Sequence, residues 1–270
     1  MKAERPDEKV YCRSLWISDV HLGSAHSKAD ELLALLDRVQ CEKLYLVGDI
    51  IDLLAMQKRV NWPPSHNQVI RKIMKLSRRK TKVIYVPGNH DWAFRTLCNS
   101  ELGAIDIRRK VVHTTANGKQ MLVTHGDELD YAVRFTRLNR LLGDLAYDIL
   151  MWLNRWNDRV RDSLKRPRWS LATWVKGNVG KAEQAINAYQ EAGIRLALDR
   201  GLDGIICGHL HYPAIREYCG VMYCNDGDWV ENCTALVEDF SGTFRLIRCT
   251  PSPGDTREVF IADVTEACTV

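Results

Sequence analysis

Long apolar runs are missing from this chain of 270 residues, and their absence narrows the class of protein. No stretch of roughly 20 apolar residues occurs, which excludes a membrane-spanning helix. The first nine residues are mostly charged and contain no apolar core, so we expect no signal peptide. The nine cysteines are scattered and never spaced as C-x-x-C, which disfavours a disulfide framework and favours reduced thiols. Together these absences predict a cytoplasmic protein.

Carboxylate, imidazole and amide side chains recur in five short motifs. These are Asp19-Val20-His21, Gly48-Asp49-Ile50-Ile51-Asp52, Gly88-Asn89-His90-Asp91, His125-Gly126-Asp127 and Gly208-His209-Leu210-His211. Each motif follows a short apolar run typical of a buried strand, at residues 15–17, 44–47, 83–86, 121–123 and 204–207. Because binding sites in α/β folds lie at the carboxyl ends of strands, we expect the five motifs to converge on one pocket.

The types of side chain in these motifs predict a site for two divalent metal ions. Imidazole, carboxylate and amide oxygen without thiolate suit Mn, Fe or Zn. Two neighbouring ions need a shared ligand, and we expect the carboxylate of Asp49 to bridge them. The other expected ligands are Asp19, His21 and His211 on one ion and Asn89, His125 and His209 on the other.

The order D-x-H, G-D-x-x-D, G-N-H-D, H-G-D, G-H-x-H resembles the calcineurin-like metallophosphoesterases. The resemblance implies a four-layer α/ββ/α sandwich in which two metal ions, Mn by preference, polarise a phosphoryl group and share the hydroxide that attacks phosphorus. His90 would donate to the transition-state charge or the leaving oxygen, and Asp91 would hold its imidazole or cap a helix. We expect Asp52 and Asp127 to orient metal-binding histidines or the backbone.

Residues 131–200 depart from this pattern and predict a helical insertion within a single domain of residues 1–270. The segment is basic and rich in tryptophan, and it lies between His125 and His209, so we expect a lid over the substrate. The residues expected to serve the lid are Trp152, Arg155, Trp156, Arg159, Lys176 and Lys181. A structural hairpin with buried tryptophans, an anionic membrane surface and nucleic acid remain alternative interpretations. Apolar content favours a lipid-bearing phosphate, and no nucleic-acid partner is expected.

A narrower resemblance involves this insertion and the segment Asn225-Asp226-Gly227-Asp228-Trp229. Both are similar to the UDP-2,3-diacylglucosamine diphosphatases of lipid A synthesis, peripheral membrane enzymes that release UMP and an acylated sugar 1-phosphate. The resemblance implies a nucleotide-linked lipid substrate and a place on the inner membrane. Those enzymes typically carry Arg where this chain has His90 and Thr where it has Leu210. The alternatives are a soluble nucleotide phosphodiesterase or phosphomonoesterase, or a metal-bound scaffold protein, which the complete ligand set disfavours.

Overall fold

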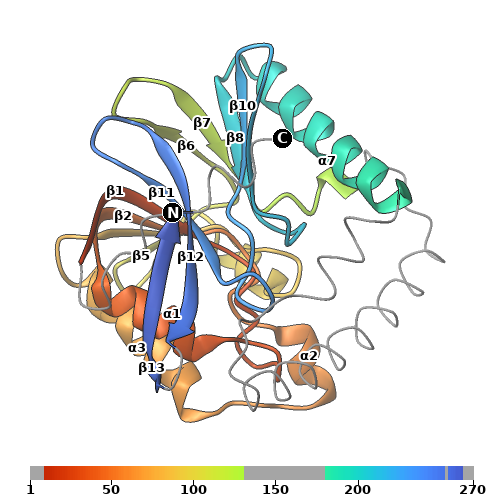
Figure 1. The fold of residues 1–270 in the computed structure, drawn as a ribbon. Helices are drawn as coiled ribbons and strands as arrows, with labels where there is room; N and C mark the ends of the chain where they lie inside the picture. The colour runs from red at the N-terminus through yellow and green to blue at the C-terminus, as the bar shows by residue number, and fades with distance from the viewer. Residues whose placement is uncertain (1–8, 131–179, 253–254, 264–270) are drawn as a thin grey trace. The chain divides into compact units, whose positions relative to one another are not determined.

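The computed structural model describes residues 9–130, 180–252 and 255–263 (Figure 1). The chain divides into two compact units, one of residues 1–127 with 194–270 and the other of residues 128–193. Most of the second unit lies outside the described residues, as do five expected lid residues: Trp152, Arg155, Trp156, Arg159 and Lys176. Lys181 falls in helix α7 (Gly180–Leu198), where only its backbone is described. The lid and the single domain therefore stay predictions.

The first unit contains two β-sheets. The eight-stranded sheet has the order β13-β12-β11-β1-β2-β3-β5-β4, and the five-stranded sheet has the order β6-β7-β8-β10-β9. The strands of the larger sheet are β1 (Val10–Ile17), β2 (Val39–Leu46), β3 (Lys82–Tyr85), β4 (Ser100–Leu102), β5 (Ile105–Ile107), β11 (Thr234–Glu238), β12 (Phe244–Ser252) and β13 (Asp255–Asp263). Those of the smaller sheet are β6 (Val111–Thr114), β7 (Gln120–Val123), β8 (Gly204–Cys207), β9 (Ala214–Tyr218) and β10 (Val221–Asn225).

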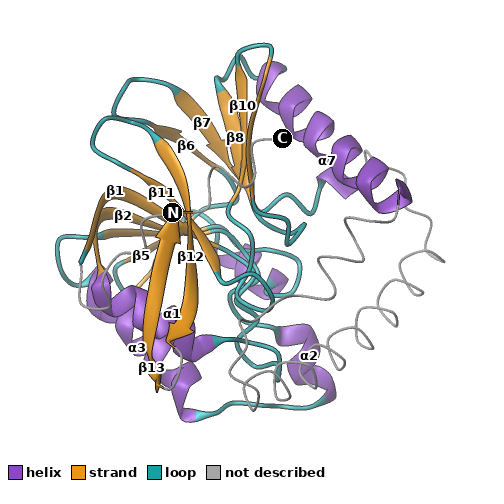
Figure 2. Ribbon diagram, viewed as in Figure 1, coloured by secondary structure: helices purple, strands orange, loops and turns teal. Residues whose placement is uncertain are grey.

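Two amphipathic helices, α1 (Ala29–Arg38) and α3 (Pro64–Ser77), cover one face of the larger sheet (Figure 2). The apolar side chains that they bury recur at spacings of three and four residues: Leu32, Leu35 and Leu36 in α1, and Val69, Ile73 and Leu76 in α3. Burial of each contributes about 1.5–3 kcal/mol.

The opposite face of the larger sheet packs on the smaller sheet. A buried apolar cluster joins Trp16 and Tyr45 of the larger sheet to Val123 and Ile206 of the smaller one. The rings of Trp16 and Tyr45 stack with centroids 5.1 Å apart. The structure therefore confirms the predicted α/β sandwich of two sheets with helices, whereas the described residues leave the helical lid untested.

Parallel pairing places the predicted motifs together. β1, β2 and β3 run parallel in the larger sheet, and β7 and β8 run parallel in the smaller one. Each of these five strands ends one to three residues before one of the five motifs. Two short helices begin directly after two of the motifs, α2 (Leu53–Lys58) after Asp52 and the 3-10 helix η1 (Trp92–Leu97) after Asp91. Among the described helices, none is long and apolar enough to cross a membrane.

Candidate active site

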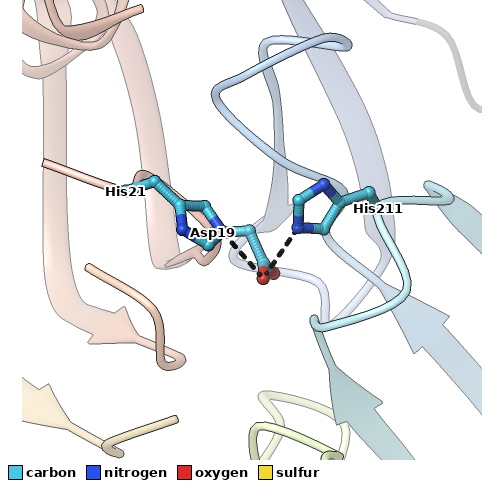
Figure 3. A group of neighbouring side chains, drawn as sticks. All are labelled: Asp19, His21 and His211. Carbon is cyan, nitrogen blue, oxygen red and sulfur yellow. Dashed lines mark hydrogen bonds and ion pairs between the residues drawn. The ribbon is translucent and has the colours of Figure 1, made fainter. Parts of the chain in front are cut away.

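The described residues contain three side-chain groups able to hold a metal ion, and Asp19, His21 and His211 form the first. One ligand atom from each lies within 4.8 Å of the others. Nε2 of His211 lies 3.1 Å from Oδ1 of Asp19, and Nε2 of His21 lies 3.9 Å from the same oxygen. Figure 3 shows the two imidazoles approaching this carboxylate from either side. Strands β1 and β8, from different sheets, therefore supply one cluster of ligands.

Asp49 belongs to both other groups. It lies with His125 and His209 in one of them and with His21 and His90 in the other. Nε2 of His125 is 3.4 Å from Oδ2 of Asp49 and 3.1 Å from Oδ1 of Asn89. The structure thus brings together all seven side chains proposed as ligands, with Asp49 between the two expected sets. It also places His90 within reach of a metal, which the sequence did not predict.

The electrostatics of this cluster suit divalent cations. Burial alone would raise the pKa of Asp19, but His211 lowers that pKa to about 2. Burial would also raise the pKa of Asp49, but the charge and hydrogen bond of His125 hold that pKa well below its usual range. Among the described residues, the buried Nε2 of His21 has no hydrogen-bond partner, whereas its Nδ1 is hydrogen-bonded to Asp52. Buried carboxylates and an imidazole nitrogen without a partner together fit two divalent ions.

The backbone is strained at most of the expected ligands. Eight non-glycine residues in the described part of the chain have positive φ. Five of them are expected ligands, with φ between 50° and 65°: Asp19, His21, Asp49, His209 and His211. Such conformations cost about 1–3 kcal/mol each and accumulate at functional sites, where the surrounding structure maintains them. This concentration of strain supports a functional role independently of the residue types.

Glycines in the motifs leave room for the ligands. A Cβ atom on Gly88 would lie 2.2 Å from Oδ1 of Asp49, and one on Gly208 would lie 2.5 Å from Oδ2 of Asp19. A Cβ atom on Gly48 would lie 2.3 Å from Nδ1 of His125. The close approach of a ligand side chain to the backbone therefore explains the glycines at positions 48, 88 and 208.

We expect Gly88→Ala to displace the Asp49 carboxylate and to lower metal content and turnover together, with the fold retained. Elemental analysis measures the metal content per chain, and a circular dichroism spectrum checks that the fold is retained. Gly118→Ala is the control, since a Cβ there meets nothing within 4 Å, although its φ of +89° adds backbone strain. Full metal content in Gly88→Ala would contradict the packing argument.

Asp52 holds two histidines at once. Its Oδ2 lies 2.9 Å from Nδ1 of His21, and its Oδ1 lies 2.9 Å from Nδ1 of His90. It also caps α2 by accepting a hydrogen bond from the backbone N–H of Ala55. Burial alone would raise the pKa of Asp52, but the hydrogen bonds from His21 and His90 hold it well below its usual range. One ionised carboxylate therefore orients an expected metal ligand and the expected proton donor together.

The structure corrects the role predicted for Asp91. Its buried carboxylate accepts hydrogen bonds from the backbone N–H groups of Gly88 (2.5 Å) and Ile50 (2.8 Å) and from the hydroxyl of Tyr85. His90 is held by Asp52 instead, and the side chain of Asp91 makes no capping bond to η1. Burial, followed by the charge of Asp49, raises the pKa of Asp91. Asp91 thus ties two ligand loops together and does not act on His90.

Asp127 also differs from expectation. Both of its carboxylate oxygens lie 2.8 Å from the Nη2 atom of Arg95 in η1, whose Nε–H donates to the carbonyl of Pro87. His125 is oriented by another group, since its Nδ1 lies 2.8 Å from the carbonyl oxygen of Val47. In the described part of the chain Asp127 therefore connects two ligand loops through Arg95 and orients no histidine.

The sequence did not identify the residues that support Asp19 from behind. The hydroxyl of Ser18 lies 2.5 Å from Oδ2 of Asp19 and 2.7 Å from Oδ1 of the buried Asp226. Burial raises the pKa of Asp226 well above its ordinary value. The backbone N–H of Trp229 donates to the carbonyl of Asp19 at 3.0 Å. The segment after β10, noticed in the sequence only through its resemblance, therefore packs behind the first ligand.

Comparison with known proteins gives one family match and several named relatives. Residues 12–213 match the calcineurin-like phosphoesterase family. UDP-2,3-diacylglucosamine hydrolase of Aeromonas salmonicida is 26% identical over 239 residues, covering 83% of this chain and 89% of that protein. The hydrolase of the same name from Neisseria gonorrhoeae is 27% identical over 235 residues, covering 83% and 92%. A solved single mutant of Vps29 from Entamoeba histolytica is 12% identical, with a TM-score of 0.47 over 93% of this chain and 98% of that one.

The family match extends over more than half of the chain and includes all five motifs. The resemblance inferred from their order is thereby confirmed. This chain belongs to the calcineurin-like phosphoesterase family.

Proposed function

We propose that this metal-dependent phosphoesterase hydrolyses a diphosphate or phosphate ester on a nucleotide-linked lipid, with UDP-2,3-diacylglucosamine or a close relative as the substrate. Two relatives, 26% and 27% identical, carry the name of that substrate. An apolar surface beside His90 provides the structural support for an acylated substrate.

Four exposed apolar side chains, named here the apolar rim, lie on α2, on η1 and two residues beyond α2. These are Leu54 (38% exposed), Val60 (62%), Trp92 (50%) and Leu97 (41%). Neither α2 nor η1 buries a single side chain, although both are largely apolar. Both helices adjoin His90, because the N–H of Leu53 donates to the His90 carbonyl at 3.2 Å and η1 begins two residues after it. Apolar side chains gathered at a site mark an interaction surface.

An acyl chain explains the apolar rim better than a water-soluble nucleotide does. Each methylene group removed from water contributes about 0.8 kcal/mol, so partial burial of one acyl chain against the apolar rim would strengthen binding considerably. The polar half of a nucleotide-linked lipid would meanwhile lie at the carboxylate and histidine cluster. The site therefore has both an apolar and a polar part, as the proposed substrate does.

The chain's own residues supply binding and proton donation. Asp19, His21 and His211 would hold one ion, Asn89, His125 and His209 the other, and Asp49 would bridge them. When bound, the two ions would supply Lewis-acid polarisation of the phosphoryl oxygens. The side chain of His90 is 32% exposed, whereas that of His211 is 13% exposed and that of His21 9%. Because Asp52 accepts at Nδ1, a protonated His90 presents Nε2–H to the phosphoryl or leaving oxygen.

We expect the double substitution Leu54→Ser with Trp92→Ser to lower turnover of a diacylated UDP-sugar by at least about tenfold, the effect of losing a few methylene contacts. Hydrolysis of a small aryl phosphodiester should change by less than about twofold, since the polar cluster is retained. Leu102→Ser is the control, because Leu102 is 46% exposed and lies on β4. Equal losses on both substrates would contradict the assignment of the apolar rim.

A soluble nucleotide phosphodiesterase or phosphomonoesterase is the second candidate. The histidine at position 90 favours this second candidate, because the lipid-specific enzymes typically carry arginine there. Turnover of a panel of acylated UDP-sugars, UDP-sugars, phosphatidyl phosphates and cyclic nucleotides with Mn separates the two candidates. Preference for the unacylated nucleotides would put the second candidate first, and no turnover of any of them would favour a metal-bound scaffold.

A further inference from the structure

Residues 53–90 contain no acidic side chain. The same segment carries nine basic ones: Lys58, Arg59, Arg71, Lys72, Lys75, Arg78, Arg79, Lys80 and Lys82. Seven of these nine fall between residues 71 and 82, in the second half of α3 and just beyond it. The net charge of the whole chain is only +4, so the positive charge of this segment is strongly concentrated.

The structure gathers part of this charge around a shallow depression of about 480 Å³. The lining, named here the α3 basic surface, consists of Ile70, Arg71, Met74, Lys75, Arg78 and Arg79. All four cations are exposed, and Ile70 and Met74 are half-buried. Lys72 is not part of the lining, because it pairs with Asp37 of α1. The α3 basic surface therefore combines two apolar side chains with four cations and no acidic group.

Helix stability explains only some of these cations. Positive side chains in the last turn of a helix interact favourably with its dipole, which accounts for Lys75 and for Arg78 at the C-cap. Arg71 lies nearly two turns before the end of α3, beyond the reach of that effect. A pair of like charges four residues apart, such as Arg71 with Lys75, destabilises a helix. The clustering of positive charge is therefore better explained by an anionic partner.

α3 also connects this surface to the metal cluster. In its first turn, Nδ1 of His66 accepts a hydrogen bond of 3.1 Å from the N–H of Gly23, two residues after the ligand His21. A helix rises about 1.5 Å per residue, so Arg71 lies roughly 8 Å and Lys75 roughly 14 Å along the axis from His66. A partner bound at the α3 basic surface would therefore contact the same helix that contacts the ligand loop carrying His21, one to three turns further along it.

We propose that the α3 basic surface docks the enzyme on an anionic phospholipid membrane, an inference that rests on the proposed lipid substrate. Four cations complement lipid phosphates, and Ile70 and Met74 offer the apolar contact that basic membrane-surface helices make. Nucleic acid is the weaker candidate, because the lining contains no aromatic side chain on which a base could stack. Docking here would bring the site to the membrane that holds the substrate.

Co-sedimentation with vesicles tests the proposal on the full-length protein. Vesicles of phosphatidylglycerol and phosphatidylcholine should bind the protein at low salt and release it at high salt, and pure phosphatidylcholine vesicles should not bind it. Lys75→Glu with Arg79→Glu should weaken binding by at least about tenfold, since each cation near an anionic surface contributes a factor of about five and two are lost. Hydrolysis of a soluble aryl phosphodiester should stay unchanged, which shows that the variant is folded.

Lys9→Glu with Arg200→Glu is the matched control. Both residues are exposed, and the pair alters the net charge by the same amount, but neither lines the depression. Equal vesicle binding by variant and control would overturn the proposal, as would binding of a single-stranded RNA in place of vesicles. If vesicle binding depends on α3 while acylated UDP-sugars are not hydrolysed, docking stands and the proposed substrate fails.

Discussion

Asp49→Ala is expected to remove both metal ions and to lower turnover by at least about a thousandfold, more than the loss of a single oxyanion donor. Asp49 is the only carboxylate in two of the three ligand groups, and it links His21 on one side to His125 and His209 on the other. Its Oδ1 also accepts the backbone N–H of His90 at 2.8 Å. The substitution therefore removes the shared ligand and loosens the loop that carries the proton donor.

Metal per chain from elemental analysis and turnover of an aryl phosphodiester measure this effect. Asp106→Ala is the matched control, because this carboxylate lies on β5 and pairs with Arg108 outside the ligand groups. His211→Ala should keep one ion, since the set around Asp49, His125 and His209 is left intact. Two ions per chain in Asp49→Ala would rule out a bridging role.

Asp52→Asn is expected to lower turnover by about a hundredfold to a thousandfold, the range for loss of a positioned acid together with weakened electrostatic stabilisation. Asparagine keeps an oxygen that can cap α2, but it loses the charge and one acceptor, so His21 and His90 cannot both be held. His90→Asn should cost about a hundredfold and leave the metal content unchanged. Asp52→Asn should lower metal affinity as well, because His21 loses its orienting partner.

The double variant distinguishes positioning from an independent effect. If Asp52 acts on turnover partly through His90, Asp52→Asn with His90→Asn should lose much less than the product of the two single losses. Metal titration of each protein separates the contribution of His21. If the double variant loses turnover by the full product of the two single losses, or if His90→Asn loses metal, the roles of these residues are wrongly assigned.

The sequence predicted the convergence of the ligands because that convergence depends on local features. A short apolar run followed by a polar motif specifies a strand and what lies at its end, and parallel strands bring such ends to the same edge of a sheet. The seven expected ligands accordingly lie together in the structure, drawn from five loops. Glycines in the motifs also contribute to this convergence, because their lack of a side chain leaves room for Asp19, Asp49 and His125.

The sequence could not predict the contacts between loops. Asp91 adjoins His90 in the chain, yet it is buried and tied to Gly88 and Ile50, while the imidazole of His90 reaches Asp52. Adjacent side chains in a turn can point in different directions, so proximity in sequence does not specify a hydrogen bond. Asp127 was expected to orient a histidine or the backbone, and the structure pairs its carboxylate with Arg95.

By itself, therefore, the sequence determined the fold class, the family and the types of ligand at the strand ends, because strand patterns and motif chemistry are local properties. Only the tertiary structure decided which groups orient those ligands and which surfaces surround them. The contact of Asp52 with His90 spans 38 positions, and that of Ser18 with Asp226 spans 208. Positive φ at five ligands and the position of α2 and η1 beside His90 likewise depend on the tertiary structure, which maintains the strained backbone and brings separate segments together.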